Sequence, residues 1–149
     1  MRLEFVSESF LKILNNEGAT VINKLFEDQD DPPKRRIMID LDGVIHRYSK
    51  GFHDGTMYDP PADGTHEALE ELKRAGYDLW VFTARINAKH GETGEVVVRN
   101  YLDKYDLSKY FTGITDKKLP ALFYIDDSAI HHTDWNNTMK ELSRRLKNV

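Results

Sequence analysis

Short apolar runs alternate with stretches of helical periodicity from residue 36 onward. The runs at 37–39, 78–82, 111–115 and 121–125 have the length of buried strands. Between them, residues 63–76 and 92–105 repeat apolar side chains at helical spacing, and the tail from Trp135 to Leu146 does the same. Strands that alternate with helices predict an α/β fold, here a Rossmann-like three-layer sandwich with a mostly parallel central sheet.

Two of the predicted helices carry details that a structure can test. Asp63 is placed to cap the helix that begins after it, and Gly76 stands where that helix is expected to stop. The Val96-Val97-Val98 run inside 92–105 also suits a strand, so both assignments stay open for that segment.

Residues 1–35 precede the alternating pattern and are predicted to form an N-terminal helical extension. Phe10, Ile13 and Leu14 share one helical face, and residues 27–33 form a charged linker that ends in two prolines. We therefore divide the chain into an extension, 1–35, and one domain, 36–149.

Composition narrows the function classes. The chain has 149 residues, a net charge of −4 and no cysteine. The charge does not suggest binding to nucleic acid through bulk electrostatics, and the lack of cysteine rules out disulfides and thiol chemistry. No apolar run approaches the roughly 20 residues that span a bilayer, and the first residues lack a secretory leader. We expect a cytoplasmic protein that does not bind membranes.

Polar clusters follow four of the predicted strands, and each alone is more typical of a turn, a cap or a solvated surface than of a site. Because the carboxyl ends of parallel strands meet at one edge of a sheet, where ligands bind in open α/β folds, we expect the four to form one site. The clusters are Asp40 with Asp42, Thr83 with Arg85, Lys117 with Lys118, and Asp126 with Asp127.

Three carboxylates at that edge, from Asp40, Asp126 and Asp127, would repel one another and raise one another's pKa. A divalent cation removes this cost, and oxygen ligands favour a hard ion, Mg²⁺. Lys118 and the Thr83 hydroxyl would add donors for a phosphoryl group, and charge neutralisation with positioning is most of what phosphoryl transfer needs.

The same residues carry a resemblance. Residues 37–45, Ile-Met-Ile-Asp-Leu-Asp-Gly-Val-Ile, resemble the first motif of the haloacid dehalogenase superfamily. Residues 79–83 are similar to its second motif, a strand that ends in Ser or Thr; Lys118 resembles the third, and residues 123–127, with the acidic pair, the fourth. The motifs occur in the family's order over about residues 36–135.

The resemblance implies roles at the acidic positions. Asp40 would be the nucleophile that forms an aspartyl-phosphate, and Asp42 the general acid and base, with its backbone carbonyl on the metal. Asp127 would be a direct metal ligand and Asp126 its neighbour. Members that are dehalogenases lack an acid at the position of Asp42, so its presence indicates phosphatase or phosphotransferase chemistry.

The basic and hydroxyl positions leave alternatives. The resemblance implies that Thr83 and Lys118 bind the phosphoryl group, with Lys117 as a rival for the lysine. Arg85 is predicted either to bind a phosphate or to pair with a carboxylate. His46 and other side chains of the 46–58 loop either touch substrate or are ordinary loop residues.

The length of the segment after the first motif limits how the site can be covered, and therefore which substrates it suits. Only residues 46–62 separate the first motif from the next helix, too few for the cap domain that many superfamily members carry. We expect an open site, which suits a nucleic-acid end, or a phosphorylated small molecule in a homo-oligomer that closes its own pocket. Nucleotide or polynucleotide phosphates are slightly preferred; a sugar phosphate and a non-catalytic binding or regulatory protein of the same fold are the alternatives. A receiver domain is disfavoured because its acidic pair precedes the phospho-acceptor.

Overall fold

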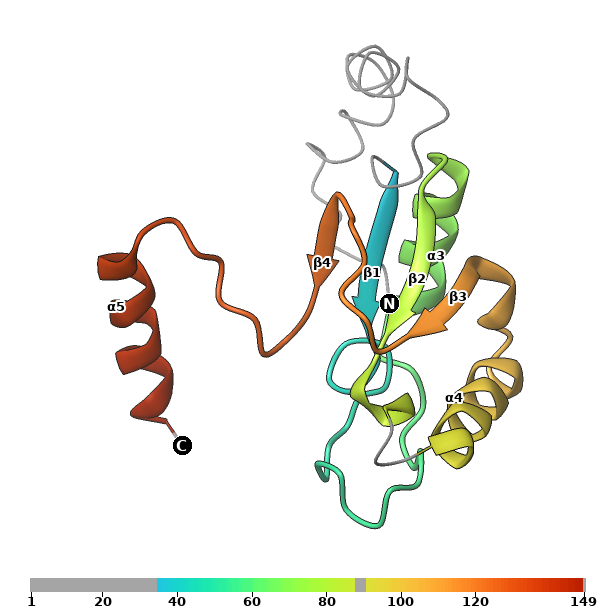
Figure 1. Ribbon diagram of the computed structural model, residues 1–149. Helices are drawn as coiled ribbons and strands as arrows, with labels where there is room; N and C mark the ends of the chain where they lie inside the picture. The colour runs from blue at the N-terminus through green and yellow to red at the C-terminus, as the bar shows by residue number, and fades with distance from the viewer. Residues whose placement is uncertain (1–34, 88–90, 149) are drawn as a thin grey trace.

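The computed structural model describes residues 35–87 and 91–148 (Figure 1). Its strands are β1 (Arg36–Asp40), β2 (Asp78–Phe82), β3 (Phe111–Thr115) and β4 (Phe123–Ile125). Its α-helices are α3 (Thr65–Arg74), α4 (Gly91–Lys104) and α5 (Trp135–Leu146), with short 3₁₀ turns η2 (Ala84–Ile86) and η3 (Ser108–Tyr110). The predicted N-terminal extension lies outside the described residues, apart from Arg35.

The four strands form one sheet in the order β3-β2-β1-β4, and every neighbouring pair is parallel. This confirms an α/β protein with a parallel sheet, consistent with a Rossmann-like arrangement. Ile39 lies opposite both Val81 of β2 and Ile125 of β4. Because of this register, the residues that follow β1 and β4 leave the sheet at the same level, next to the end of β2.

One face of the sheet carries the hydrophobic core. Since side chains alternate along a strand, Ile37 and Ile39 of β1 point to the same side as Leu79 and Val81 of β2. All four pack in one buried cluster with Leu69 of α3 and with Val98, Tyr101 and Leu102 of α4. Both helices therefore cover this face over β1 and β2, and they fix the edge at which the candidate site forms.

The helix boundaries confirm part of the sequence pattern and correct part of it. The prediction that Asp63 caps the first helix is wrong, because the cap position is Gly64, in a left-handed conformation without a side-chain hydrogen bond. The helix stops as expected: Gly76 has φ +89° and its N–H donates to the Lys73 carbonyl. The segment predicted over 92–105 forms helix α4, which ends at Lys104, so residues 96–98 are helical and not a strand.

Helix α5 has the bounds that its apolar spacing predicts, but it does not pack on the sheet. None of its residues is buried, and Figure 1 shows it standing apart from the sheet at the end of an extended connection. Within the described residues, no helix is long and apolar enough to cross a membrane.

Candidate active site

Three carboxylates meet where β1 and β4 end. Asp40 is the last residue of β1, and Asp126 and Asp127 directly follow β4. Strands β1 and β4 are neighbours in the sheet and are joined by backbone hydrogen bonds. Each offers one oxygen, and the three oxygens lie within 4.8 Å of one another. The cluster brings together residues 86 positions apart in sequence, as the strand order requires, and its donor set and spacing fit a hard divalent cation.

The environment of Asp40 works against its ionised form. Burial raises its pKa from 3.8 to about 7, and the negative charges of Asp126 and Asp127 add to the rise. A hydrogen bond that Leu41 N–H donates to Asp40 Oδ1, at 2.8 Å, acts in the opposite direction but is outweighed. Asp40 is therefore a carboxyl group that titrates near neutral pH, and a positive charge placed beside it would favour its ionised form.

Gly43 makes room for this cluster. Its φ of +85° belongs to the left-handed region that glycine adopts without strain. A Cβ atom at this position would lie only 2.2 Å from Asp127 Oδ2, so no other residue fits unless Asp127 moves. Gly43 thus lets the chain turn after the two aspartates and also permits the close approach of the acidic pair.

Asp42, two residues beyond Asp40, lies in a different environment. Its Oδ2 accepts a hydrogen bond from Arg85 Nε at 2.6 Å, and its Oδ1 accepts one from Arg85 Nη2 at 3.0 Å. This is a two-point ion pair between a planar guanidinium and a carboxylate, which fixes the orientation of both groups. Arg85 thus pairs with a carboxylate, the second of the two roles that its position predicts.

His46 is the second partner of Asp42. The turn after β1 folds back so that the His46 N–H donates to the Leu41 carbonyl and the Gly43 N–H to the His46 carbonyl. His46 Nδ1 lies 2.8 Å from Asp42 Oδ1, and its Nε2 accepts from the Asp59 N–H at 3.2 Å. Because Nε2 accepts, we assign the proton to Nδ1, which donates to Asp42.

Of the two alternatives for His46, the structure favours the one without substrate contact, since its side chain is fully buried. Its structural role was missed, although the sequence holds a signal for it. His46 follows Asp42 by four residues across a glycine, a spacing at which a tight turn brings the two side chains together.

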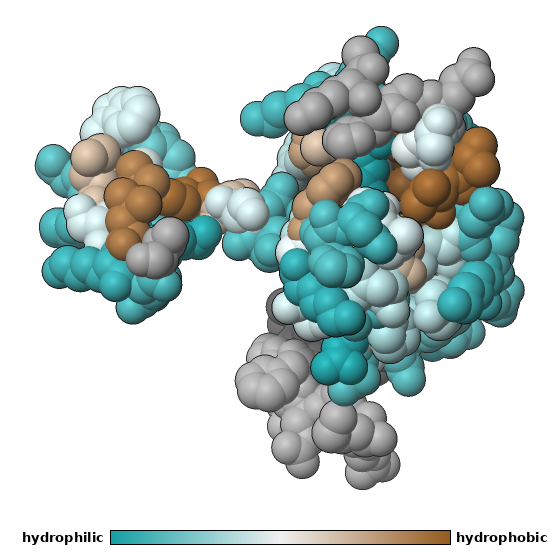
Figure 2. Space-filling model, turned by 90° about the horizontal axis from the view of Figure 1, so that it is seen from below, coloured by the Kyte–Doolittle hydropathy of each residue, from teal (hydrophilic) through white to brown (hydrophobic). Residues whose placement is uncertain are grey.

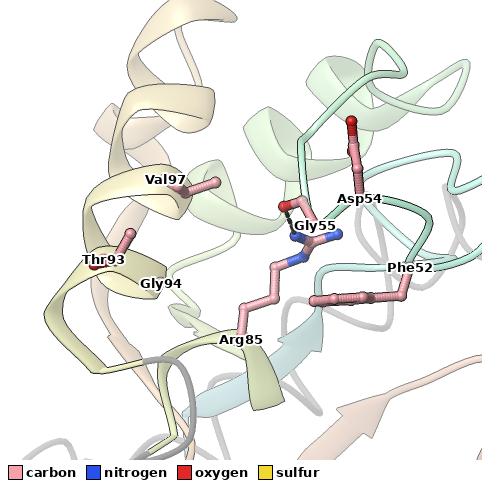
Figure 3. A pocket seen from close by; sticks show the side chains of 7 residues that line it. All are labelled: Phe52, Asp54, Gly55, Arg85, Thr93, Gly94 and Val97. Atoms are coloured by element: carbon pink, nitrogen blue, oxygen red, sulfur yellow. Dashed lines mark hydrogen bonds between the residues drawn. The ribbon is translucent and has the colours of Figure 1, made fainter.

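Arg85 also joins the 46–58 loop to the site. Its Nη1 donates to the Gly55 carbonyl at 2.7 Å, and its guanidinium carbon lies 5.3 Å from the centre of the Phe52 ring. Figure 3 shows the guanidinium between that ring and the Gly55 carbonyl, at the side of a pocket of about 200 Å³ that the loop forms with the start of α4. Arg85 is one of its lining residues, whereas Asp40, Asp126 and Asp127 are not.

The residues predicted to bind phosphate, Thr83 and one of two lysines, have partners other than the carboxylate cluster. Thr83 is buried, and its hydroxyl accepts from the Arg85 N–H at 3.2 Å at the start of η2. The Lys118 ammonium lies 5.7 Å from the centre of the Tyr124 ring, on the strand that leads to the acidic pair. Lys117 is exposed, and its N–H donates to Thr115 Oγ1. Neither lysine forms an ion pair with the carboxylate cluster, so the choice between them remains a prediction.

Comparison of the chain with family models, with curated proteins and with solved structures gave no match. The class that fold and site define is therefore a coarse one, an α/β protein with a carboxylate cluster at the carboxyl edge of a parallel sheet.

Proposed function

We propose that the protein is a magnesium-dependent phosphohydrolase of the haloacid dehalogenase type that acts on phosphate monoesters through an aspartyl-phosphate on Asp40. The observation that carries the proposal is the cluster of Asp40, Asp126 and Asp127, three residues whose carboxylate oxygens lie within 4.8 Å of one another. The order of the four motifs and the two-residue step from Asp40 to Asp42 support the same assignment.

The residues of the chain divide the reaction into two displacements. The Asp40 carboxylate attacks phosphorus as the bond between phosphorus and the leaving oxygen breaks, and Asp42 gives that oxygen a proton. Asp42 then takes a proton from a water molecule that attacks the phosphorus, and the bond to Asp40 breaks to release phosphate. Thr83 and Lys118 would donate hydrogen bonds to the phosphoryl oxygens.

Asp40, Asp126 and Asp127 would hold the Mg²⁺, with the backbone carbonyl of Asp42. When bound, the ion neutralises the carboxylates and the charge of a phosphoryl group. The Asp40 carboxyl, whose pKa burial raises to about 7, would then be ionised at neutral pH and available as the nucleophile.

The finer features of the protein belong to the same proposal. These are a three-layer sandwich, an N-terminal helical extension over 1–35, a domain over 36–149 without a cap, and a cytoplasmic location. The loop from Arg47 to Ala62 contributes one isolated bridge, between Pro61 and His46, and no helix or strand, which supports an open site. A nucleotide or the phosphorylated end of a polynucleotide is the preferred substrate, with a sugar phosphate as the alternative.

A phosphatase screen tests the proposal. The full chain is assayed with Mg²⁺ and with EDTA on nucleotides, sugar phosphates and phosphorylated oligonucleotides. We expect hydrolysis that EDTA abolishes and that is highest on nucleotides or oligonucleotides. Activity confined to sugar phosphates would end the nucleotide preference, and activity unaffected by EDTA would contradict the metal assignment.

The two-point ion pair between Arg85 and Asp42 favours a second candidate function, a metal-binding module that does not turn over substrate. A carboxylate that already accepts hydrogen bonds from two partners is restrained from exchanging protons with a substrate. Calorimetry with Mg²⁺ separates the two functions, because the module would bind the ion and hydrolyse no substrate in the screen.

A further inference from the structure

On the core face of the sheet, the described helices leave strand β4 uncovered. Phe123 and Ile125 of β4 lie opposite Ile37 and Ile39 of β1 and point to the same side. The β1 side chains are 3% exposed beneath α3 and α4, whereas Phe123 is 57% exposed and Ile125 41%. Among the described residues, no helix covers β4 on this face.

Helix α5 carries an exposed apolar stripe that no surface covers among the described residues. Trp135, Met139, Leu142 and Leu146 follow one another at spacings of four, three and four residues, which places them on a single stripe. Trp135 is 72% exposed, Met139 54% and Leu146 67%. Figure 2 shows apolar surface gathered on one side of α5, at the left of the view. A helix of 12 residues is marginally stable alone in water, so this one needs a surface to pack on.

The connection between the two directs α5 away from its own sheet. Asp126 Oδ1 accepts from the N–H groups of Ser128 and Ala129, which holds the start of the connection at the end of β4. At its other end the His132 ring packs on Trp135, with ring centres 5.1 Å apart, and His132 Nδ1 lies 2.7 Å from Thr138 Oγ1. Between these points the chain runs outward, and α5 stands beyond the edge of the sheet (Figure 1).

We propose that the protein is a dimer in which each copy places its α5 over Phe123 and Ile125 of the other copy. Reciprocal exchange of α5 about one twofold axis would bury both the apolar stripe of this helix and the exposed side chains of β4 in each copy. It needs no foreign surface, because the chain itself supplies both the apolar stripe of α5 and the exposed side chains of β4. An unrelated partner helix would leave α5 as exposed as before.

The area that a dimer requires is within reach. A stable interface buries about 800 Å² per partner, and a twofold exchange forms two helix-on-strand contacts, so each has to supply about half of that. Fully buried aromatic side chains cover about 150–250 Å² each, so Trp135 of one copy and Phe123 of the other supply up to about half of the area that the two sides of one contact bury together. The exposed side chains of Met139, Leu146 and Ile125 add to it. Ile125 directly precedes Asp126, so the exchanged helix would also lie beside the open candidate active site.

Crosslinking of cysteine variants tests the exchange in the full chain, which has no native cysteine. Phe123→Cys and Met139→Cys chains with tags of different size are expressed together and treated with a short bismaleimide. We expect a crosslinked species that contains one chain of each kind. Arg144→Cys, on the opposite side of α5 from the apolar stripe, replaces Met139→Cys as the matched control and should crosslink much less.

The alternatives give different products. If α5 folds back on its own β4, the Phe123→Cys/Met139→Cys double variant crosslinks within single chains and the mixed single variants do not, which overturns the exchange. If neither experiment gives a product, another segment or partner occupies β4, and the proposal also fails.

Sedimentation of the unmodified protein provides a measurement that is independent of any variant and of the proposed enzyme activity. We expect twice the 17.3 kDa of one chain, and the mass of a single chain for Met139→Glu. A wild-type protein that sediments as a 17.3 kDa monomer would overturn the dimer.

Discussion

Asp40 and Asp42 are two residues apart and have opposite surroundings. Asp40 lies among carboxylates, and burial and like charge raise its pKa to about 7. Asp42 lies against the Arg85 guanidinium and the Nδ1 of His46, both within 3.0 Å. One aspartate has its counter-charge built into the chain, whereas the charges that raise the pKa of the other are of its own sign.

This difference separates two kinds of site. Asp42 has its polar partners without a ligand, since its carboxylate pairs with both the Arg85 guanidinium and the His46 imidazole. The Asp40 cluster is satisfied only when a proton or a cation from solution enters it. Ligand dependence should therefore be confined to Asp40, Asp126 and Asp127, while Asp42 depends on the integrity of its neighbours.

The largest effect is expected from neutralising the two aspartates in turn. Asp40→Asn should leave no measurable phosphatase turnover, because an amide does not form the aspartyl-phosphate. Asp42→Asn should lower kcat by about 10²–10⁴-fold, the usual contribution of a general acid and base. Steady-state kinetics with saturating Mg²⁺ measure both. Asp63→Asn, at an exposed loop position, is the control and should match the wild type; full activity of Asp40→Asn would refute the nucleophile.

Replacing Arg85 tests how the built-in counter-charge acts. Arg85→Lys keeps the charge but loses the two-point contact with Asp42, so we expect kcat to fall by about 10²-fold with KM little changed, as for a misplaced catalytic group. The loss should be smaller for an aryl phosphate whose leaving group needs no proton. Arg99→Lys, in an exposed pair with Glu95, is the matched control and should be neutral. A rise in KM alone, equal for all substrates, would assign Arg85 to phosphate binding instead.

Gly43→Ala tests the surroundings of Asp40, because it disturbs the cluster of Asp40, Asp126 and Asp127 without changing a charge. The new Cβ atom would displace Asp127, so we expect Mg²⁺ affinity to fall by about 10–100-fold, as when a residue that positions a ligand is lost. Calorimetric titration of the metal measures it. Gly51→Ala also places an alanine in the left-handed region, at φ +64°, but with open space around the Cβ, and should bind Mg²⁺ normally. Equal losses in the two variants would mean that strain, and not displacement of Asp127, is the cause.

The sequence predicts the acidic cluster better than the surroundings of Asp42. Asp40, Asp126 and Asp127 follow apolar runs, and parallel pairing of adjacent strands is enough to bring them together. The partners of Asp42 depend on where loops fold. His46 is brought to Asp42 by a turn, and Arg85 is held in place by the Gly55 carbonyl, thirty residues earlier.

The same distinction explains the remaining differences in the fold. Helix α5 has the bounds that its periodicity predicts, yet its spacing says nothing of the surface on which it packs. Asp63 has the residue type of a cap, but the chain enters α3 through a left-handed Gly64, which places the aspartate one position too early. Local patterns thus specified the elements, and contacts between distant segments decided what the elements face.

The smallest effect, and the most specific to Asp40, is the pH dependence of metal binding. Since its folded pKa is raised from 3.8 to about 7, the metal-free protein holds a proton on Asp40 that the unfolded chain has lost, and Mg²⁺ must displace it. Affinity should fall by about tenfold per pH unit below 7 and level off above it. By the same linkage, stability in EDTA should decline as pH rises from about 4 through 7, and saturating Mg²⁺ should remove that decline. Calorimetry and thermal melts across this range measure the two effects. Asp40→Asn, which has no proton to displace, should flatten both profiles, and a variant that keeps the wild-type slopes would place the titrating group elsewhere.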